Sequence, residues 1–273
     1  MVRPTLRARI VNRWPSLAPV VVGLDGQIAW VLTWAALLLV LFRKFGGSTT
    51  YETLLRPDHQ VQSPYLTLYG DAYWFGTSFV LLGFIPLLLL LPRRFRPTRL
   101  GLGLGDWRFA LKVLVPTFVV MVIIVVVASR FSVFWRYYPL NGVIGHEAGL
   151  YFAGRGEAPE GFLGRFLTYE LLYGLYFVGW EYFYRGFLTF GLYDRLGINA
   201  VFIGNIPFAL LHVGKPFPEL MGSIVAGVVL GLFALRTRSF WYPWLIHASI
   251  AWTMDAAAIQ RRAEQILTGT ASS

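Results

Sequence analysis

Three long runs of apolar residues without a single charge dominate the first half of the chain. They read "AWVLTWAALLLVLF", "SFVLLGFIPLLLLL" and "VLVPTFVVMVIIVVVA". A mostly apolar segment of about 20 residues is long enough to cross the hydrocarbon core of a bilayer as a helix. Of the 273 residues, 56% are hydrophobic and 14% are charged, which is far from the balance of an ordinary soluble domain. The sequence therefore predicts an all-α, polytopic transmembrane helix bundle.

Seven spans are expected from the apolar segments. Their approximate bounds are 26–43, 73–91, 109–129, 166–190, 198–212, 219–235 and 240–258. They divide the chain into a basic cytoplasmic tail at 1–25, an N-terminal transmembrane scaffold with its loops at 26–165, a transmembrane core at 166–258, and a C-terminal tail at 259–273.

The arginines indicate the orientation in the membrane. The segment "PRRFRPTRLGLGLGDWR" at 92–108 holds five arginines in a short connection, so the positive-inside rule places it in the cytoplasm. Alternation of the spans then puts the N-terminus of this multi-pass protein inside as well. Arg261 and Arg262 break the pattern, so either that tail lies outside or one helix is miscounted. The net charge is +10, and the arginines lie at the ends of the apolar runs. This position favours membrane lipid headgroups over nucleic acid as partners.

The last four predicted spans differ from the first three because they contain polar and ionisable side chains. Such groups are costly at membrane depth unless they are paired or hydrated, so they are expected to face the interior of the bundle. They are Glu170, Glu181, Arg185, Asn205, His212, Glu219, His247 and Asp255.

Helical periodicity groups these side chains. Glu181 and Arg185 share one face, in the order that favours an ion pair, and Glu170 lies on nearly the same stripe three turns earlier. Asn205 and His212 share a face of the next span. Three helices, the third carrying His247, are therefore expected to direct polar groups toward one cavity.

Phe208 lies on the same face as His212, and His247 shares its face with Ala251. A carboxylate in a low-dielectric pocket, balanced by a guanidinium, can act as a general base for water. Nearby imidazoles can orient that water and donate to an oxyanion. These groups favour hydrolysis of a peptide bond within the membrane. The chain has no cysteine and no serine with a matching base partner. No cofactor is expected, although two histidines and a carboxylate leave Zn²⁺ open.

The motifs "WEYFYRGF", "FALLH" and "LIHASIAW" resemble the three ordered motifs of the CPBP family of intramembrane proteases, over roughly residues 165–258. That family includes the type II CAAX prenyl endopeptidases and the Abi proteins linked to bacteriocin processing and immunity. The resemblance implies a catalytic core at 166–258 and an endopeptidase of the glutamic type. It implies a peptide or protein substrate, prenylated or plain, with Glu181, Arg185, His212 and His247 as the catalytic residues.

The sequence departs from the family pattern at two positions. The first motif of the family has a glutamate pair, three residues and an arginine, but Trp180 stands at the first glutamate, the expected base. Ala251 replaces the Asn or Asp of the third motif. Three interpretations follow. Glu181 has become the base; Glu170 or Glu219 approaches the histidines from elsewhere; or hydrolysis is lost and the protein binds a peptide or partner.

Supporting roles are predicted for Asn205, Phe208, Trp180 and Glu170. Asn205 would supply the polarity that Ala251 lacks. Tyr182, Phe183 and Tyr184 are most simply packing or interfacial aromatics, although a groove lined by them would suit an apolar or prenylated substrate.

The remaining polar residues are given structural roles. Glu219 is expected to cap the sixth helix, and Asp255 is expected to be solvated near the end of the last one. The 131–165 loop, with His146, Glu147, Glu157 and Glu160, is expected to be a solvated surface rather than a lid.

Overall fold

A computed structural model describes residues 6–18, 21, 23, 25–55, 64–91, 97–155 and 159–269. These residues form helices and their connections, with no β-strand among them, which confirms the all-α prediction. Residues 1–5 and 270–273 of the predicted tails, 92–96 of the arginine-rich loop, and Glu157 lie outside the described residues. Residues 56–63, from the connection after the first predicted span, also lie outside the described residues.

Helical segments lie at the positions of the seven predicted spans, although α12 is only 12 residues long and the number of spans stays a prediction. They are α3 (Gly26–Phe45), the rod of α5 (Pro64–Ser78), η3 (Phe79–Phe84) and α6 (Ile85–Leu90), α7 (Trp107–Ala128), α10 (Phe162–Glu181) with η6 (Tyr182–Phe190), α12 (Asn199–Leu210), α13 (Phe217–Thr237) and α14 (Trp241–Thr268). Four helices among the described residues are long and apolar enough to cross a membrane: Gly26–Phe45, Thr67–Leu90, Trp107–Ala128 and Phe217–Thr237.

Short elements connect these segments. They are α1 (Leu6–Arg13), η1 (Pro15–Leu17), α4 (Ser48–Thr50), η2 (Tyr51–Leu55), η5 (Pro97–Leu100), α8 (Ser132–Tyr137), α9 (Gly142–Phe152) and α11 (Gly191–Leu196).

Side-chain caps set the starts of three helices. Asp25 accepts hydrogen bonds from the backbone N–H groups of Gln27 and Ile28 at the start of α3. Asp106 accepts a hydrogen bond from the Phe109 N–H at the start of α7. At the start of α9, Asn141 accepts one from the Ile144 N–H. The backbone bond from Phe109, followed by the bond from Arg236, lowers the pKa of the exposed Asp106 carboxyl. Asp106 is therefore an anion at neutral pH.

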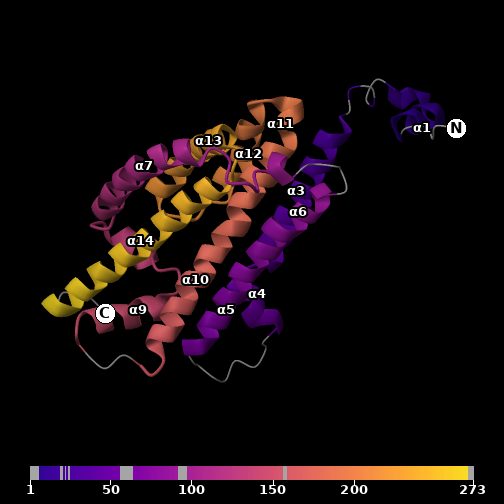
Figure 1. Ribbon diagram of the computed structural model, residues 1–273. Coiled ribbons are helices and arrows are strands. Elements are labelled where there is room, and N and C mark those ends of the chain that lie inside the picture. Colours follow the sequence, from indigo (N-terminus) through magenta and orange to yellow (C-terminus); the bar gives the residue numbers. More distant parts are fainter. Residues whose placement is uncertain are drawn as a thin grey trace.

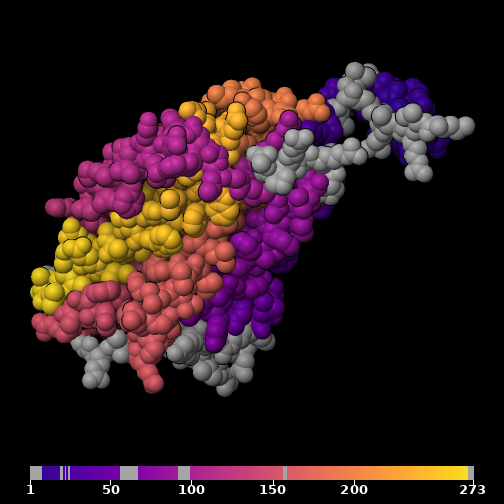
Figure 2. Space-filling model, in the orientation of Figure 1, coloured from indigo at the N-terminus to yellow at the C-terminus, as the bar shows by residue number. Residues whose placement is uncertain are grey.

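The helix α10 is the central rod of the bundle. It packs against α5 and η3 on one side and against α14 on the other (Figure 1). Figure 2 shows α7, α14 and α10 as successive bands across one face of the molecule, and α14 contacts both of its neighbours. The polar residues of α10 and α14 are therefore brought together by direct packing of the two helices.

Two glycines allow α10 to cross the η3 segment very closely. A Cβ on Gly83 would lie 3.2 Å from the Cα of Gly179, and a Cβ on Gly179 would lie 2.4 Å from the carbonyl oxygen of Ser78. The Ser78 hydroxyl donates to the carbonyl of Tyr176 at 3.2 Å across the same crossing. Gly179 directly precedes Trp180 and Glu181, so this contact fixes the height of the candidate site in the bundle.

The segment between the third and fourth spans differs from the prediction. The 131–165 connection is not a solvated loop, because it contains α8 and α9, and α9 packs closely on α14. Glu147 is buried, and its carboxylate accepts a hydrogen bond from Arg165 of α10 at 2.6 Å. A buried charge needs such a partner, which the sequence pattern of the loop did not reveal.

The last helix is longer than predicted, since α14 continues to Thr268. Arg262 lies within it and donates to the carbonyl oxygens of Trp135 and Tyr138 at 3.2 Å each, so it holds α8 against α14. The prediction that Asp255 is solvated is wrong. Its side chain is fully buried because α9 and α10 cover that side of α14.

The Gly83–Gly179 crossing gives a test of the packing. Replacing Gly179→Ala should lower the free energy of unfolding by roughly 1–3 kcal/mol, because the new methyl group overlaps the backbone of η3. Gly76→Ala on the α5 part of the same rod is the matched control, since no atom lies within 4 Å of its Cβ position. Detergent-solubilised protein would be unfolded by denaturant. Equal stability of both variants would contradict the close crossing.

Candidate active site

The catalytic-motif segment adopts an unusual backbone. At Glu181 the α-helix α10 ends, and Tyr182–Phe190 continues as the π-helix η6. The Thr189 hydroxyl donates to the carbonyl of Tyr184, five residues earlier, at 2.8 Å. π-Helical segments are rare and occur frequently at functional sites. All residues from Glu181 to Thr189 are buried, so the motif lies inside the bundle and does not face lipid.

Glu181 and Arg185 form the predicted ion pair. Arg185 Nη1 lies 3.0 Å from Glu181 Oε2 and 3.1 Å from Glu181 Oε1. The two side chains are 0% and 2% exposed. Arg185 Nη2 also donates to the carbonyl of Gly227 on α13 at 3.5 Å, and its guanidinium lies 4.5 Å from the Phe208 ring centroid. The cation is therefore compensated by a carboxylate, a carbonyl and an aromatic face.

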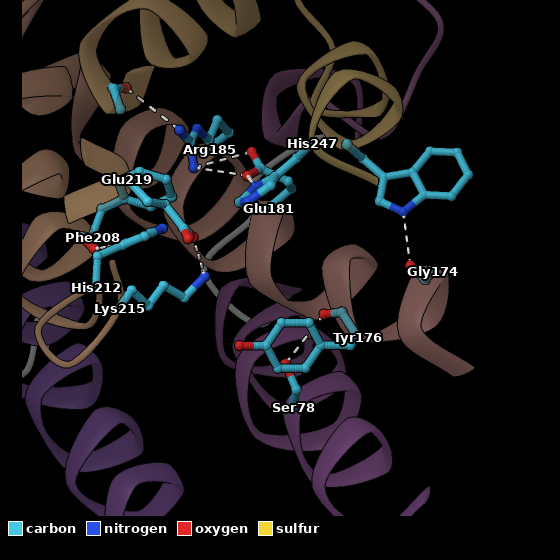
Figure 3. A network of polar contacts seen from close by, with 12 residues as sticks. Ser78, Gly174, Tyr176, Glu181, Arg185, Phe208, His212, Lys215, Glu219 and His247 are labelled. Atoms are coloured by element: carbon cyan, nitrogen blue, oxygen red, sulfur yellow. Dashed lines mark hydrogen bonds and ion pairs between the residues drawn. The ribbon is translucent and has the colours of Figure 1, made fainter. Parts of the chain in front are cut away.

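His247 of α14 binds the other side of the same carboxylate. Its Nδ1 lies 2.6 Å from Glu181 Oε1, and its side chain is 16% exposed (Figure 3). When Nδ1–H donates to Glu181, the second ring nitrogen, Nε2, keeps its lone pair and can accept a proton. The structure thus brings Glu181, Arg185 and His247 together in direct contact.

His212 lies one aromatic ring away from this group. Its Nδ1–H donates to the carbonyl of Phe208 at 2.7 Å, which leaves Nε2 as an acceptor. The Phe208 ring centroid is 4.7 Å from that of His212 and 6.1 Å from that of His247. Phe208 is therefore the shared neighbour of the two imidazoles.

Asn205 shares its face with Phe208 as predicted, because both side chains lie against Gly227 of α13. Its amide donates to the carbonyl of Ile224 at 2.8 Å and so joins α12 to α13. This close approach requires Gly227, where a Cβ would lie 1.7 Å from the Asn205 Oδ1 atom. The same glycine supplies the carbonyl that accepts from Arg185. Asn205 therefore supports the site by fixing the position of α13 against α12.

Trp180 stands at the position of the first family glutamate and is 4% exposed. Its ring stacks on Tyr176 at 5.5 Å and makes an edge contact with His212 at 6.0 Å. The indole Nε1–H is buried and has no hydrogen-bond partner among the described residues. The sequence alone does not reveal this unpartnered donor, because it depends on the side chains that pack around Trp180.

The other candidate acids lie away from Glu181. Asp255 of α14 is fully buried within electrostatic reach of Glu170 and Arg262, so Glu170 belongs to that group. Glu219 lies in the first turn of α13 as predicted, but it accepts hydrogen bonds from Tyr138 and Lys215 instead of capping the backbone. Figure 3 shows the Lys215–Glu219 pair on the side of the site where His212 lies.

The described residues contain no group of three or more His, Cys, Asp or Glu side chains arranged to hold a metal ion. Glu181 and His247 are two such residues in direct contact, and Arg185 occupies the other side of the carboxylate. Metal-independent chemistry remains a prediction for the assay described below.

The long apolar helices are those of an integral membrane protein, and the buried side chains of Glu181, Arg185 and His247 meet inside the bundle. Residues 164–253, about a third of the chain, match the family described as type II CAAX prenyl endopeptidase Rce1-like, so this segment is similar to that family. No curated protein and no solved structure matches the chain. The family match supports peptidase activity on a peptide or protein substrate in the membrane.

The buried ion pair gives a test of what holds the site together. Glu181→Gln should lower the free energy of unfolding by about 3–5 kcal/mol, because Arg185 is left as a buried, uncompensated cation. The double variant Glu181→Gln/Arg185→Met should recover most of that loss. Denaturant unfolding of purified protein in detergent measures both.

The matched control for this test is Glu264→Gln, which breaks the half-exposed Arg261–Glu264 pair of α14. Its cost should stay below about 1 kcal/mol, since exposed pairs contribute little. A double variant as unstable as the single one would contradict the role assigned to the buried cation.

Proposed function

We propose that the protein is an intramembrane endopeptidase in which Glu181 acts through His247. The observation that carries this proposal is the 2.6 Å contact between Glu181 Oε1 and His247 Nδ1, next to Arg185. Glu181 is completely buried and already bound on both sides, whereas the His247 side chain keeps 16% of its surface exposed. The imidazole is therefore the better group to meet water, and the carboxylate orients it and fixes its tautomer.

The reaction then follows ordinary general acid–base chemistry. His247 Nε2 takes a proton from water while the water oxygen attacks the carbonyl carbon of the peptide bond. Glu181 stabilises the imidazolium that forms, and Arg185 keeps Glu181 ionised. The imidazolium returns its proton to the amine as the C–N bond breaks. His212, with a second free Nε2 acceptor, orients the water.

Trp180 supplies a donor where the family has an acid. We assign to its indole N–H, which is buried and has no partner among the described residues, the role of donor to the carbonyl oxygen once substrate displaces the packing around it. The aromatic side chains around it, Tyr176, Tyr184 and Phe208, provide an apolar wall that suits a prenylated or otherwise hydrophobic peptide.

A second candidate function is binding without hydrolysis. The observation in its favour is that Trp180 is packed tightly in the aromatic cluster at the place of the expected base, and that Ala251 is buried without a polar group. In that case the Glu181–Arg185–His247 set is a structural core that shapes a binding site for a peptide or partner protein.

The deciding assay uses full-length protein reconstituted in liposomes with prenylated and plain C-terminal peptides. Wild type should cleave the peptide, and His247→Ala should lower kcat by about 10²–10⁴-fold because the general base is lost. Cleavage in the presence of a chelator tests the prediction that no metal is required. If wild type binds the peptide but releases no product, and His247→Ala binds equally well, the binding function is correct.

The same assay separates the candidate acids. Glu170→Gln should leave cleavage intact, since Glu170 lies with Asp255 and not with His247. Loss of cleavage in Glu170→Gln with retention in His247→Ala would show that the proposed dyad is not the base.

The role of Trp180 is tested by Trp180→Phe, which keeps an aromatic ring and removes only the N–H donor. If the indole stabilises the oxyanion, kcat should fall by about a hundredfold while KM changes little. Trp252→Phe is a matched control, because its indole N–H donates to the Glu170 carbonyl away from Glu181. Unchanged kcat in Trp180→Phe would limit Trp180 to packing.

A further inference from the structure

A large cavity lies at the end of the bundle where the arginine-rich connection meets α13. Its volume is about 1060 Å³. Asp106 and Arg99 line it from the connection, Tyr193 from α11, and Arg236 and Arg238 from the end of α13. No residue of the candidate active site lines this cavity.

The cavity is located at the level of a membrane surface. Two helices that are long and apolar enough to cross a bilayer have an end there, since α7 begins at Trp107 and α13 ends at Thr237. Arg99 and Arg108 of the arginine-rich connection lie at this end of the protein, next to the start of α7. A ligand in this cavity would therefore be at the depth of lipid headgroups.

One positive charge in the cavity is left over. Arg99 lies 3.7 Å from Asp194, and Arg236 lies 2.9 Å from Asp106, so two arginines are paired with the two acids of the cavity. Arg238 has no carboxylate partner among the described residues. The cavity thus has a net cationic character and suits an anion.

The backbone at Arg238 adds an independent observation. Arg238 ends α13 in the left-handed conformation, with φ 56° and ψ 35°, and it is the one non-glycine residue with positive φ among those described. Glycine is the residue that normally takes this position at a helix end. An arginine at this position adopts a backbone conformation that its Cβ disfavours. The backbone alone therefore does not account for an arginine here.

The wall of the cavity is firmly built. Gly105 is also left-handed, and a Cβ on it would lie 1.8 Å from the carbonyl oxygen of Thr237. Asp106 N–H donates to that oxygen at 2.9 Å, and Tyr242 hydroxyl donates to the Leu104 carbonyl at 2.5 Å. The arginine-rich connection is therefore held against the α13–α14 turn, and the cavity does not depend on a loose loop.

We propose that this cavity binds the phosphate headgroup of an anionic membrane lipid, with Arg238 as its principal cation. Phe190, Tyr193 and Leu235 give the cavity an apolar side next to the charged one, which suits the glycerol and upper acyl region of a lipid better than a free phosphate. The site is separate from the Glu181–His247 dyad and does not rest on the proposed hydrolysis.

The test measures lipid adducts on the full-length protein in detergent by native mass spectrometry. Wild type should bind phosphatidylglycerol more tightly than phosphatidylcholine. Arg238→Gln should weaken phosphatidylglycerol binding about fivefold, the effect expected for one basic residue at a membrane surface. The matched control is Arg108→Gln, an exposed arginine on the same side that does not line the cavity, and it should bind as wild type does.

A second variant separates lipid binding from folding. Arg238→Gly should lose the same binding while its melting temperature stays equal to or rises above that of wild type, because glycine relieves the left-handed backbone. Undiminished phosphatidylglycerol binding in Arg238→Gln and Arg238→Gly would overturn the proposal, as would an equal loss in Arg108→Gln. Displacement of the lipid by an equal concentration of inorganic phosphate would assign the site to a free anion and also overturn it.

Discussion

The buried Arg185 guanidinium is the constraint on which the packing of the surrounding helices depends. A cation with 2% of its side chain exposed needs a counterion, further acceptors and close helix contacts. Glu181 supplies the negative charge, the Gly227 carbonyl supplies an acceptor from α13, and the Phe208 ring covers one face. Three helical segments are thereby held around one charge, and His247 joins from a fourth. The same contacts that stabilise the pair also set the geometry of the dyad.

The all-α fold could be predicted from the sequence because apolar composition and helical periodicity identify each membrane helix separately. Runs such as 109–129 are apolar throughout, so each was recognised as a helix without knowledge of its neighbours. The pairing of Glu181 with Arg185 followed from residues four apart on one helix face. Contacts between distant segments were not accessible in this way. The sequence pattern predicts that Glu147 and Asp255 are solvated, but both are buried, because their burial depends on the packing of α9 and α10 against α14.

The site shows a similar division between local and long-range information. Periodicity predicted that Phe208 and His212 share a face, and their rings are in contact. It also grouped Asn205 with them, but that amide is taken by α13, whose close approach depends on a glycine 22 residues away in the sequence, Gly227. The π-helical backbone after Glu181 has no simple sequence signal. The orphaned Trp180 N–H became visible only when its surroundings were known.

The 28-residue helix α14 has a mechanical consequence. Near its start Tyr242 is bonded to the arginine-rich connection, His247 follows one turn later, and Arg262 is bonded to α8 close to its far end. A rigid rod anchored at both ends cannot slide or rotate locally. A displacement of the arginine-rich connection would therefore reach His247 through the same helix that holds Arg262 at its other end.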